Sequence, residues 1–369
     1  MSTEENKAIA RHRYEEEMNV HATARSEQMK KSPMGRLGSL SIVAALCGAL
    51  LLLLTSVAPV HATASGAAQT WYIAAGAETA DHAISNMMYL PSNIWIHQGD
   101  TVVWTAGSGE PHTVAFVSSH SALPLPLGGP CLGAQLPQNT QPFAGDATNF
   151  VNCADTASGK SYAFISSGLL TTLPSEFTAQ GIPFVYGDYH LTFTTTGDFT
   201  YYCVIHNGMT GMVHVLPAGQ PLPYTQVDYN AQAARERGQM IGAGYRLYGQ
   251  AEREASKGVV VAGIGDSMVD VMRFIRPNVT IHVGQSVTFV NESSAPHTVT
   301  FGPEQGDPTL PYGDPTNFTG GPLNSGYFGA FISPADKTYT VTFNKAGVYS
   351  YHCALHDYLG MAGEVDVVS

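Results

Sequence analysis

The sequence has few charged residues, and positive charge is the scarcer kind. Only 12% of its 369 residues are Asp, Glu, Lys or Arg, and 17 basic residues stand against 29 acidic ones. Seven of the basic residues lie in the first 36 positions, so the rest of the chain carries 10 basic and 23 acidic residues. Nucleic-acid binding needs a basic face, so this composition argues against a nucleic-acid partner. The acidic excess suits a protein partner with a basic docking face, and it equally suits solubility.

Residues 37–60 lack charge altogether and form a long apolar run. The run follows three basic residues, Lys30, Lys31 and Arg36. Basic residues next to a membrane segment stay on its cytoplasmic side. We therefore expect the residues after the run to lie outside the cytoplasm, in a secreted, periplasmic or membrane-anchored protein.

Two alternatives remain for this N-terminal region. Residues 1–36 are predicted to be a cytoplasmic n-region, and residues 37–64 a signal peptide or a membrane anchor. The small residues Ala62-Thr63-Ala64 offer a cleavage site for a signal peptidase. The apolar run is also nearly long enough to span a bilayer and remain as an anchor.

The length and composition favour two β-rich domains. A chain of 369 residues suits two domains of common size. It contains 38 glycines, 22 prolines and 10% aromatic residues. Frequent Gly and Pro between aromatic and β-branched segments favour an all-β architecture over a helical one.

The chain matches itself, which indicates an internal duplication. Residues 89–116 parallel residues 274–301, and in both copies a histidine follows a turn glycine by thirteen positions. Residues 197–215 parallel residues 347–367, and both segments contain a cysteine followed by a histidine. The two halves are therefore copies of one module.

The repeat predicts the domain boundaries. We expect a first domain over residues 70–217, with an insertion at about 120–165, and a second domain over residues 258–369. Between them, residues 218–257 are rich in Ala, Gln, Glu and Arg. This composition predicts a helical linker, which its four glycines weaken.

Each module carries the pattern of short β-strands. Apolar residues alternate before the cysteine of the first copy, at Phe199 and Tyr201, and the second copy repeats the pattern. Turn-forming clusters of Gly, Ser, Asn and Pro separate these segments. Many short strands at such intervals predict an antiparallel β-sandwich in each module.

The second module contains the ligand types of a type 1 copper site. Such a site needs two imidazoles and a thiolate near a plane, with a weak axial thioether. His297 stands upstream, and Cys353, His356 and Met361 follow within nine residues of one another. The spacing Cys-x2-His-x4-Met, which continues as Met-x-Gly-x-Val, resembles the loop of plastocyanins.

The first module repeats the scheme with His112, Cys203 and His206. Its axial ligand is either Met209 or Met212. The order Met209-x-Gly-x-Val matches the order after the methionine of the second module, which favours Met209. The spacing Cys-x2-His-x2-Met resembles the shorter loop of amicyanins.

Together the modules resemble the cupredoxin (blue copper) family, of the plastocyanin and amicyanin kind. The resemblance implies a Greek-key cupredoxin β-sandwich for each module, so we expect an all-β chain of two such sandwiches joined by the helical linker. The tandem arrangement is where the chain departs from the family. It also implies two type 1 coppers and outer-sphere electron transfer with a redox protein partner through an exposed imidazole. By position on the loop, that imidazole is His206 or His356.

The insertion of the first module holds two further cysteines, Cys131 and Cys153. The upstream His and the Cys are 91 residues apart in the first module and 56 in the second. In an oxidising compartment the two extra cysteines predict a disulfide, which contributes about 3 kcal/mol by restricting the unfolded chain. A second metal site at this pair is the alternative, with His120 as its nearest further ligand.

Three functional classes fit two copper-binding modules. The leading one is an electron carrier. The second is an oxidoreductase like copper nitrite reductase or small laccase, and the third is a copper store or chaperone. Laccase-type centres use His-x-His and His-Cys-His patterns, which the sequence lacks, and a store would favour Met-rich or His-rich tracts. His352 precedes Cys353 as in nitrite reductases, but the other imidazoles of such a catalytic site are missing, so we expect an outward strand residue.

Overall fold

The computed structural model describes residues 67–117, 142–143, 151–155, 160–182, 184–206, 208–256, 258–329 and 336–369. The predicted n-region and the signal or anchor segment lie outside these residues. Among the described helices, none is both long and apolar enough to span a membrane. Residues 65–369 form one compact unit.

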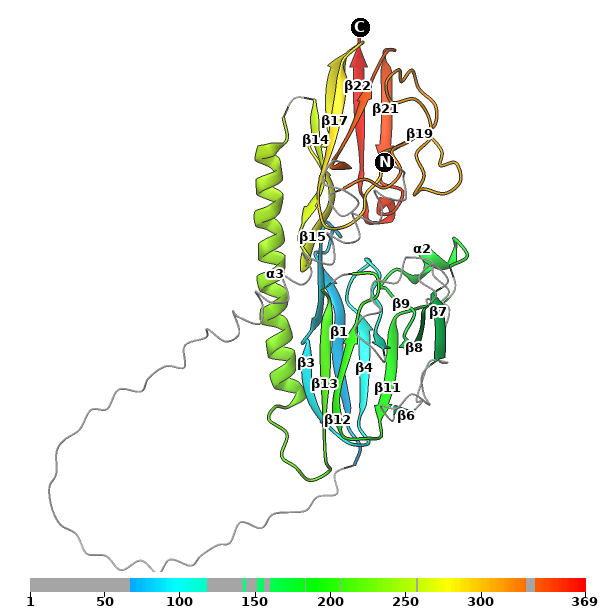
Figure 1. The fold of residues 1–369 in the computed structure, drawn as a ribbon. Coiled ribbons are helices and arrows are strands. Elements are labelled where there is room, and N and C mark those ends of the chain that lie inside the picture. The colour runs from blue at the N-terminus through cyan, green and yellow to red at the C-terminus, as the bar shows by residue number, and fades with distance from the viewer. Residues whose placement is uncertain are drawn as a thin grey trace, which may run out of the picture. The chain divides into compact units, whose positions relative to one another are not determined.

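The first domain is a two-sheet sandwich (Figure 1). The strands of its first sheet are β1 (Thr70–Glu78), β2 (Ile84–Leu90), β4 (Thr101–Ala106), β6 (Pro142–Phe143) and β11 (Asp188–Phe193). The strands of its second sheet are β3 (Asn93–His97), β5 (Ala115–Val117), β7 (Val151–Asp155), β8 (Lys160–Ser166), β12 (Gly197–Tyr202) and β13 (Thr210–Leu216). Beside them lie the short pair β9 (Leu169–Leu170) and β10 (Val185–Tyr186) and the helix α2 (Pro174–Thr178).

The second domain repeats this plan. The strands of its first sheet are β14 (Val259–Gly265), β15 (Val269–Ile275), β17 (Ser286–Glu292) and β20 (Thr338–Thr342). The strands of its second sheet are β16 (Asn278–His282), β18 (Thr300–Phe301), β19 (Leu323–Asn324), β21 (Gly347–His352) and β22 (Ala362–Val368). The prediction of an all-β chain with two cupredoxin-like sandwiches is therefore confirmed.

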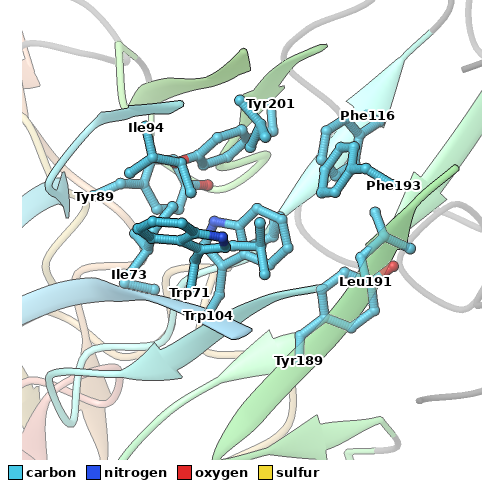
Figure 2. Packing of buried hydrophobic residues seen from close by; sticks show 14 of the residues in the cluster. Trp71, Ile73, Tyr89, Ile94, Trp104, Phe116, Tyr189, Leu191, Phe193 and Tyr201 are labelled. Atoms are coloured by element: carbon cyan, nitrogen blue, oxygen red, sulfur yellow. The ribbon is translucent and has the colours of Figure 1, made fainter. Parts of the chain in front are cut away.

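Each sandwich encloses an aromatic core, and the two cores are copies. In the first domain Trp104 packs edge to face against Tyr201, with ring centroids 5.2 Å apart. Figure 2 shows these rings among the other buried aromatic residues of that core. In the second domain Phe289 and Tyr351 take the same positions, with centroids 5.0 Å apart. Edge-to-face pairs add to the hydrophobic stabilisation of a core.

The two domains share one continuous sheet, which the sequence did not reveal. Strand β2 of the first domain pairs antiparallel with β15 of the second, with Ser85 opposite Asp270. On one side of this pair the Met87 N–H donates to the carbonyl of residue 268, and on the other the Met272 N–H donates to that of residue 83, both at 2.8 Å. These partners are equivalent in the repeat, so the domains meet through the same strand, as the subunits of a two-fold dimer do.

The predicted helical linker is confirmed as α3 (Gln226–Glu254), a helix of 29 residues. It begins at a capping box, in which the Thr225 side chain accepts from the Asp228 N–H and the Asp228 carboxylate accepts from the Thr225 N–H. The helix contacts β1 and β2 of the first domain and β14 and β15 of the second. It therefore covers the strands through which the domains are joined.

Candidate metal centres

The second domain brings three of its four predicted ligands into a buried triangle. His297 lies between β17 and β18, Cys353 directly follows β21, and His356 precedes the short 3-10 helix Asp357–Leu359. The Nδ1 atoms of the two imidazoles are 3.1 Å apart, and the Cys353 Sγ lies 3.7 Å from that of His297 and 3.4 Å from that of His356. The centre of a triangle with these edges is about 2.0 Å from each atom, which suits metal–nitrogen and metal–sulfur bonds of about 2.0 to 2.3 Å.

The first domain forms the matching triangle. The His112 Nδ1 lies 3.1 Å from the His206 Nδ1, and the Cys203 Sγ lies 3.5 Å from the His206 Nδ1. These three groups and their counterparts in the second domain are clusters in which every ligand atom lies within 4.8 Å of the others. The donor set of each, two imidazoles and one thiol, fits copper.

The two methionines that the repeat aligned occupy equivalent places. The Cys203 N–H donates to the Met209 carbonyl, and the Cys353 N–H donates to the Met361 carbonyl, both at 3.0 Å. Both methionines are buried in the core clusters that contain these cysteines. Met212 instead lies in β13 on the half-exposed side of the strand, where its N–H donates to the Ser92 carbonyl.

A threonine after each upstream histidine supports the thiol, and the sequence analysis missed it. The N–H of Thr113 donates to the Cys203 Sγ at 3.3 Å, and the N–H of Thr298 donates to the Cys353 Sγ at 3.4 Å. Each threonine hydroxyl also accepts from the N–H of the residue after the cysteine, at 2.8 Å. The signal was present, because Pro-His-Thr-Val recurs unchanged in both copies.

A glycine packs against each upstream histidine from β1 or β14. A Cβ atom built on Gly76 would lie 2.3 Å from the His112 Nε2, and one on Gly263 would lie 2.3 Å from the His297 Nε2. Both glycines also have positive φ angles, +77° and +82°. These positions therefore require glycine, both for conformation and for the close approach of an imidazole.

The two centres differ in the contact that the Nε2 atom of the upstream histidine makes. In the first domain the His112 Nε2 lies 3.0 Å from the hydroxyl of Ser108. In the second domain the equivalent hydroxyl, that of Ser293, donates to the buried carboxylate of Asp270 at 2.5 Å. Within the part of the chain that the structure describes, the His297 Nε2 has no hydrogen-bond partner. The centres are therefore related but not identical.

The electrostatics of each triangle favour an ionised thiol. Burial raises the pKa of Cys203, but the charge and hydrogen bonding of His206 and His112 outweigh it, so the pKa of the thiol lies well below its ordinary value. The same causes, with His356 first among the neighbours, lower the pKa of Cys353. A thiolate is the form that binds a metal.

A buried carboxylate, Glu110, contacts a predicted ligand of each domain. It is only 6% exposed, and its Oε1 lies 3.1 Å from the His206 Nε2, while its Oε2 lies 3.5 Å from the His356 Nε2. The hydroxyl of Tyr358 donates to the same Oε2 at 3.5 Å. Burial opposes ionisation of Glu110, but the hydrogen bond of His206 and the nearby imidazoles outweigh it and lower its pKa to about 2.

This contact corrects the expectation of an exposed imidazole. His356 is 4% exposed, and the side chain of His206 is 13% exposed. The physical reason is the shared sheet, which sets the ligand loop of one domain against that of the other. Nothing in the sequence distinguishes Glu110, since only the pairing of the two domains gives it a second partner.

His352 lies on β21 next to Cys353 and is half-buried. Its Nε2 lies 3.0 Å from a carboxylate oxygen of Glu304, and the carboxylate of Asp357 completes a cluster within 4.8 Å. Neither of these neighbours is an imidazole. The predicted disulfide stays a prediction, because Cys131 and the side chain of Cys153 lie outside the described residues.

Comparison with known proteins agrees with the donor sets. The family model of copper binding proteins, the plastocyanin/azurin family, matches residues 77–216 and 261–368. The chain belongs to this family. Plastocyanin of Solanum tuberosum is 30% identical over 97 residues, which are 26% of this chain and 88% of the plastocyanin. Amicyanin of Paracoccus denitrificans is 27% identical over 117 residues, which are 32% of this chain and 71% of the amicyanin.

Two solved structures are similar to part of the chain. The crystal structure of amicyanin from Paracoccus versutus is 28% identical and covers 31% of this chain and 83% of the amicyanin, with a TM-score of 0.18. The oxidised form of plastocyanin from Dryopteris crassirhizoma is 18% identical and covers 30% of this chain and 99% of the plastocyanin, with a TM-score of 0.21.

Proposed function

We propose that this member of the plastocyanin/azurin family is an exported electron-transfer protein with two type 1 coppers, one in each domain. The observation that carries the proposal is the pair of buried His-Cys-His triangles, each of a size that fits one metal ion. Copper, when bound, supplies a one-electron couple between Cu(I) and Cu(II). Every other part of the function comes from how the chain holds the ligands.

In the second domain the proposed ligands are His297, Cys353, His356 and Met361. In support, both imidazoles present Nδ1 to the thiol, and the methionine is buried next to it. His297 comes from the segment between β17 and β18, and the other three residues come from the single loop between β21 and β22. The loop therefore fixes three ligands, and the sandwich fixes the fourth.

In the first domain the proposed ligands are His112, Cys203 and His206, with Met209 in the axial position. The choice of Met209 over Met212 rests on the hydrogen bond from the Cys203 N–H to the Met209 carbonyl, which repeats that of the second domain. Met212 lies on a strand whose inward positions are Gly211 and Val213, so its side chain points away from the core.

Contacts from outside the donor set hold the ligands in place, which is what rapid electron transfer requires. Thr113, Thr298, Gly76 and Gly263 hold the thiols and upstream imidazoles by backbone hydrogen bonds or close contact. Ligands fixed in this way move little when the charge of the centre changes. A small change in structure lowers the barrier to outer-sphere electron transfer.

A substrate-converting oxidoreductase of the nitrite reductase or laccase kind is the second candidate. The observation in its favour is the cluster of Glu304, His352 and Asp357, which lies beside Cys353 and could hold another metal. Its two exposed carboxylates are common surface groups, however, and the cluster supplies a single imidazole. A copper store is less well supported, because both triangles are buried rather than open to exchange.

Export and a redox protein partner complete the proposal. Export rests on the apolar run at residues 37–60, with cleavage or retention as an anchor both open. The acidic excess after residue 36 suits a partner with a basic docking face.

Single-site variants test the proposal. Residues 65–369 are expected to bind two coppers and to absorb intensely in the visible range through thiolate-to-copper charge transfer. The Cys203→Ser and Cys353→Ser variants are each expected to bind one copper and to lose one of two blue centres. Binding of a single copper by the unaltered protein, or loss of both centres in one variant, would refute two independent sites. Nitrite reduction that disappears in the His352→Ala variant would instead support the enzyme.

A further inference from the structure

We propose that Glu110 is a bridge through which the two copper centres exchange electrons within one molecule. This inference rests on the proposed function, since it needs a copper in each domain. It assigns a role to a residue that neither triangle contains.

The geometry of the two loop imidazoles carries the inference. His206 and His356 each turn Nδ1 toward the cysteine of their own domain, at 3.5 and 3.4 Å. Their second nitrogens, the Nε2 atoms, therefore point out of the triangles. Both Nε2 atoms reach the carboxylate of Glu110, one at each oxygen, at 3.1 and 3.5 Å. A single side chain thus lies between one ligand of each centre.

The bridge is shielded from water. Glu110 is 6% exposed, and Tyr358 from the second domain donates its hydroxyl to the same carboxylate. The ring of Tyr358 packs edge to face against Phe177 of α2 in the first domain, with centroids 5.2 Å apart. Hydrogen bonds in such a dry environment are stronger and better fixed than in water.

The duplication also indicates a specific role for Glu110, because the second copy has a different residue at the equivalent position. Glu110 precedes Pro111-His112, and Ala295 occupies the equivalent position before Pro296-His297. Ala295 packs against Met87, Met272 and Leu359 in an apolar cluster. The shared sheet relates the domains by a pseudo-two-fold axis, so a glutamate in both copies would bring two carboxylates to one interface. The chain has a glutamate in one copy only, and its carboxylate contacts both imidazoles.

The contact creates a path for electrons between the centres. Electron tunnelling slows steeply across gaps and less steeply along bonds, so a path with two hydrogen-bond-length gaps is efficient. One centre loses one electron and the other gains it, while no bond is made or broken and no proton leaves the carboxylate or the imidazoles.

The test measures how fast an electron redistributes between the centres after brief reduction of the oxidised protein by less than one electron per molecule. Rapid freezing and electron paramagnetic resonance follow the two Cu(II) signals, with reference spectra from the Cys203→Ser and Cys353→Ser variants. We expect a redistribution phase whose rate does not depend on protein concentration. In the Glu110→Ala variant this phase should slow by about tenfold or more.

Two further variants distinguish electron transfer through Glu110 from a role in which Glu110 only holds the two domains together. Glu110→Gln keeps the shape of the side chain but loses the negative charge that faces both imidazoles, so its rate should lie between those of the wild type and Glu110→Ala. Because a carboxylate stabilises the more positive oxidised centre, Glu110→Gln should also raise both reduction potentials, and that of the His206 centre more. Asp198→Asn, which removes a carboxylate from the non-ligand His214, should change neither the rate nor the potentials.

The outcomes are distinguishable from failure of the proposed function. Fewer than two blue coppers would refute the two-copper proposal. Two blue coppers whose electron exchange depends on protein concentration, or is as fast in Glu110→Ala as in the wild type, would overturn the bridge alone. A slower rate without any change of potential in Glu110→Gln would mean that Glu110 only fastens the domains, and would also overturn it.

Discussion

At the scale of single residues, each proposed centre depends on main-chain groups as much as on its ligands. The thiol of Cys203 accepts from the Thr113 N–H, and the Cys203 N–H donates to the Met209 carbonyl. These bonds tie the cysteine to the upstream histidine segment and to the methionine. The ligand types could be predicted from the sequence because their order and spacing recur in both copies. The recurrence of Pro-His-Thr-Val in both copies marked Thr113 as well, but its contact with the thiol could not be read from the residue type, because a backbone N–H makes that contact.

Glu110 illustrates a second kind of limit. In the sequence it is one polar residue in the turn Gly-Ser-Gly-Glu-Pro, and nothing in that pattern indicates a functional carboxylate. Its role depends on His356, which is 246 positions away and belongs to the other domain. Such a contact follows from how the domains pair, and no local pattern encodes the pairing.

The axial position of the first centre gives a prediction at this scale. Met209→Leu removes the buried thioether next to Cys203, and we expect it to raise the reduction potential of that centre alone. Met212→Leu is the matched control, because its side chain lies on the outward side of β13 and should leave both potentials unchanged. Spectroelectrochemical titration of both variants measures the effect. The reverse ranking would assign the axial position to Met212.

The metal-free protein should show a characteristic pH dependence. Its folded state holds the pKa of His206 at about 10 and of His356 at about 9, and the pKa values of both cysteines well below 9.0. Below about pH 6.5 the unfolded chain holds protons on both the imidazoles and the thiols, whereas the folded chain holds them on the imidazoles only. The unfolded state therefore binds more protons, so the free energy of unfolding falls as the pH falls. Above about pH 9 the unfolded thiols lose protons while the folded imidazolium groups still hold theirs, so stability falls as the pH rises.

These groups therefore add stability mainly between about pH 6.5 and 9. Denaturant titrations of the metal-free protein across the pH range measure it. The double variant Cys203→Ser/Cys353→Ser should lose this contribution, so the difference in unfolding free energy should be greatest in that window. A difference that grows steadily toward high pH would contradict the thiolate–imidazolium pairs.

At the scale of elements, the packing of helix α3 explains why it contains a glycine at a buried position. Glycines weaken a helix, and four of them lie in this one. Gly244, however, is buried, and a Cβ atom there would lie 2.2 Å from the Cγ2 of Ile84 on β2. At this position the absence of a side chain lets the helix approach the sheet. The helix itself was predictable from composition, but the strand that it covers was not.

Two substitutions of α3 test this close approach. Gly244→Ala should destabilise the protein by about 1 to 3 kcal/mol, because the added methyl group meets Ile84 in a packed interface. Gly238→Ala is the control, since it is exposed and a Cβ atom there meets nothing within 4 Å. It should stabilise the helix by about 0.8 to 1 kcal/mol. Equal effects of the two substitutions in denaturant titrations would contradict the packing of α3 on β2.

At the scale of the whole molecule, the duplicated domains are joined as one body. Alternation and turn residues predicted the two sandwiches, but not that β2 and β15 would join their first sheets. The pattern of an edge strand does not say whether water or another strand lies beside it. The joint sheet and the helix across it make the two domains interdependent, although their sequences could each form a separate sandwich.

The shared sheet and helix α3 lead to a prediction about how residues 65–369 unfold on heating. Because β2, β15 and α3 link the two cores, both domains should unfold in one cooperative transition. Differential scanning calorimetry of the metal-free form measures it, since bound metals violate two-state behaviour. Two well-separated transitions, each assignable to one domain by the Cys203→Ser and Cys353→Ser variants, would contradict the linkage.

The proposed function requires two one-electron centres in each chain. The most direct measurement is a stoichiometric reductive titration of the fully oxidised, copper-loaded protein, followed by its visible absorption. The account predicts that two electron equivalents per chain bleach the whole thiolate-to-copper band, and that one equivalent bleaches the band of Cys203→Ser or Cys353→Ser. Complete bleaching of the wild type by one equivalent would contradict it.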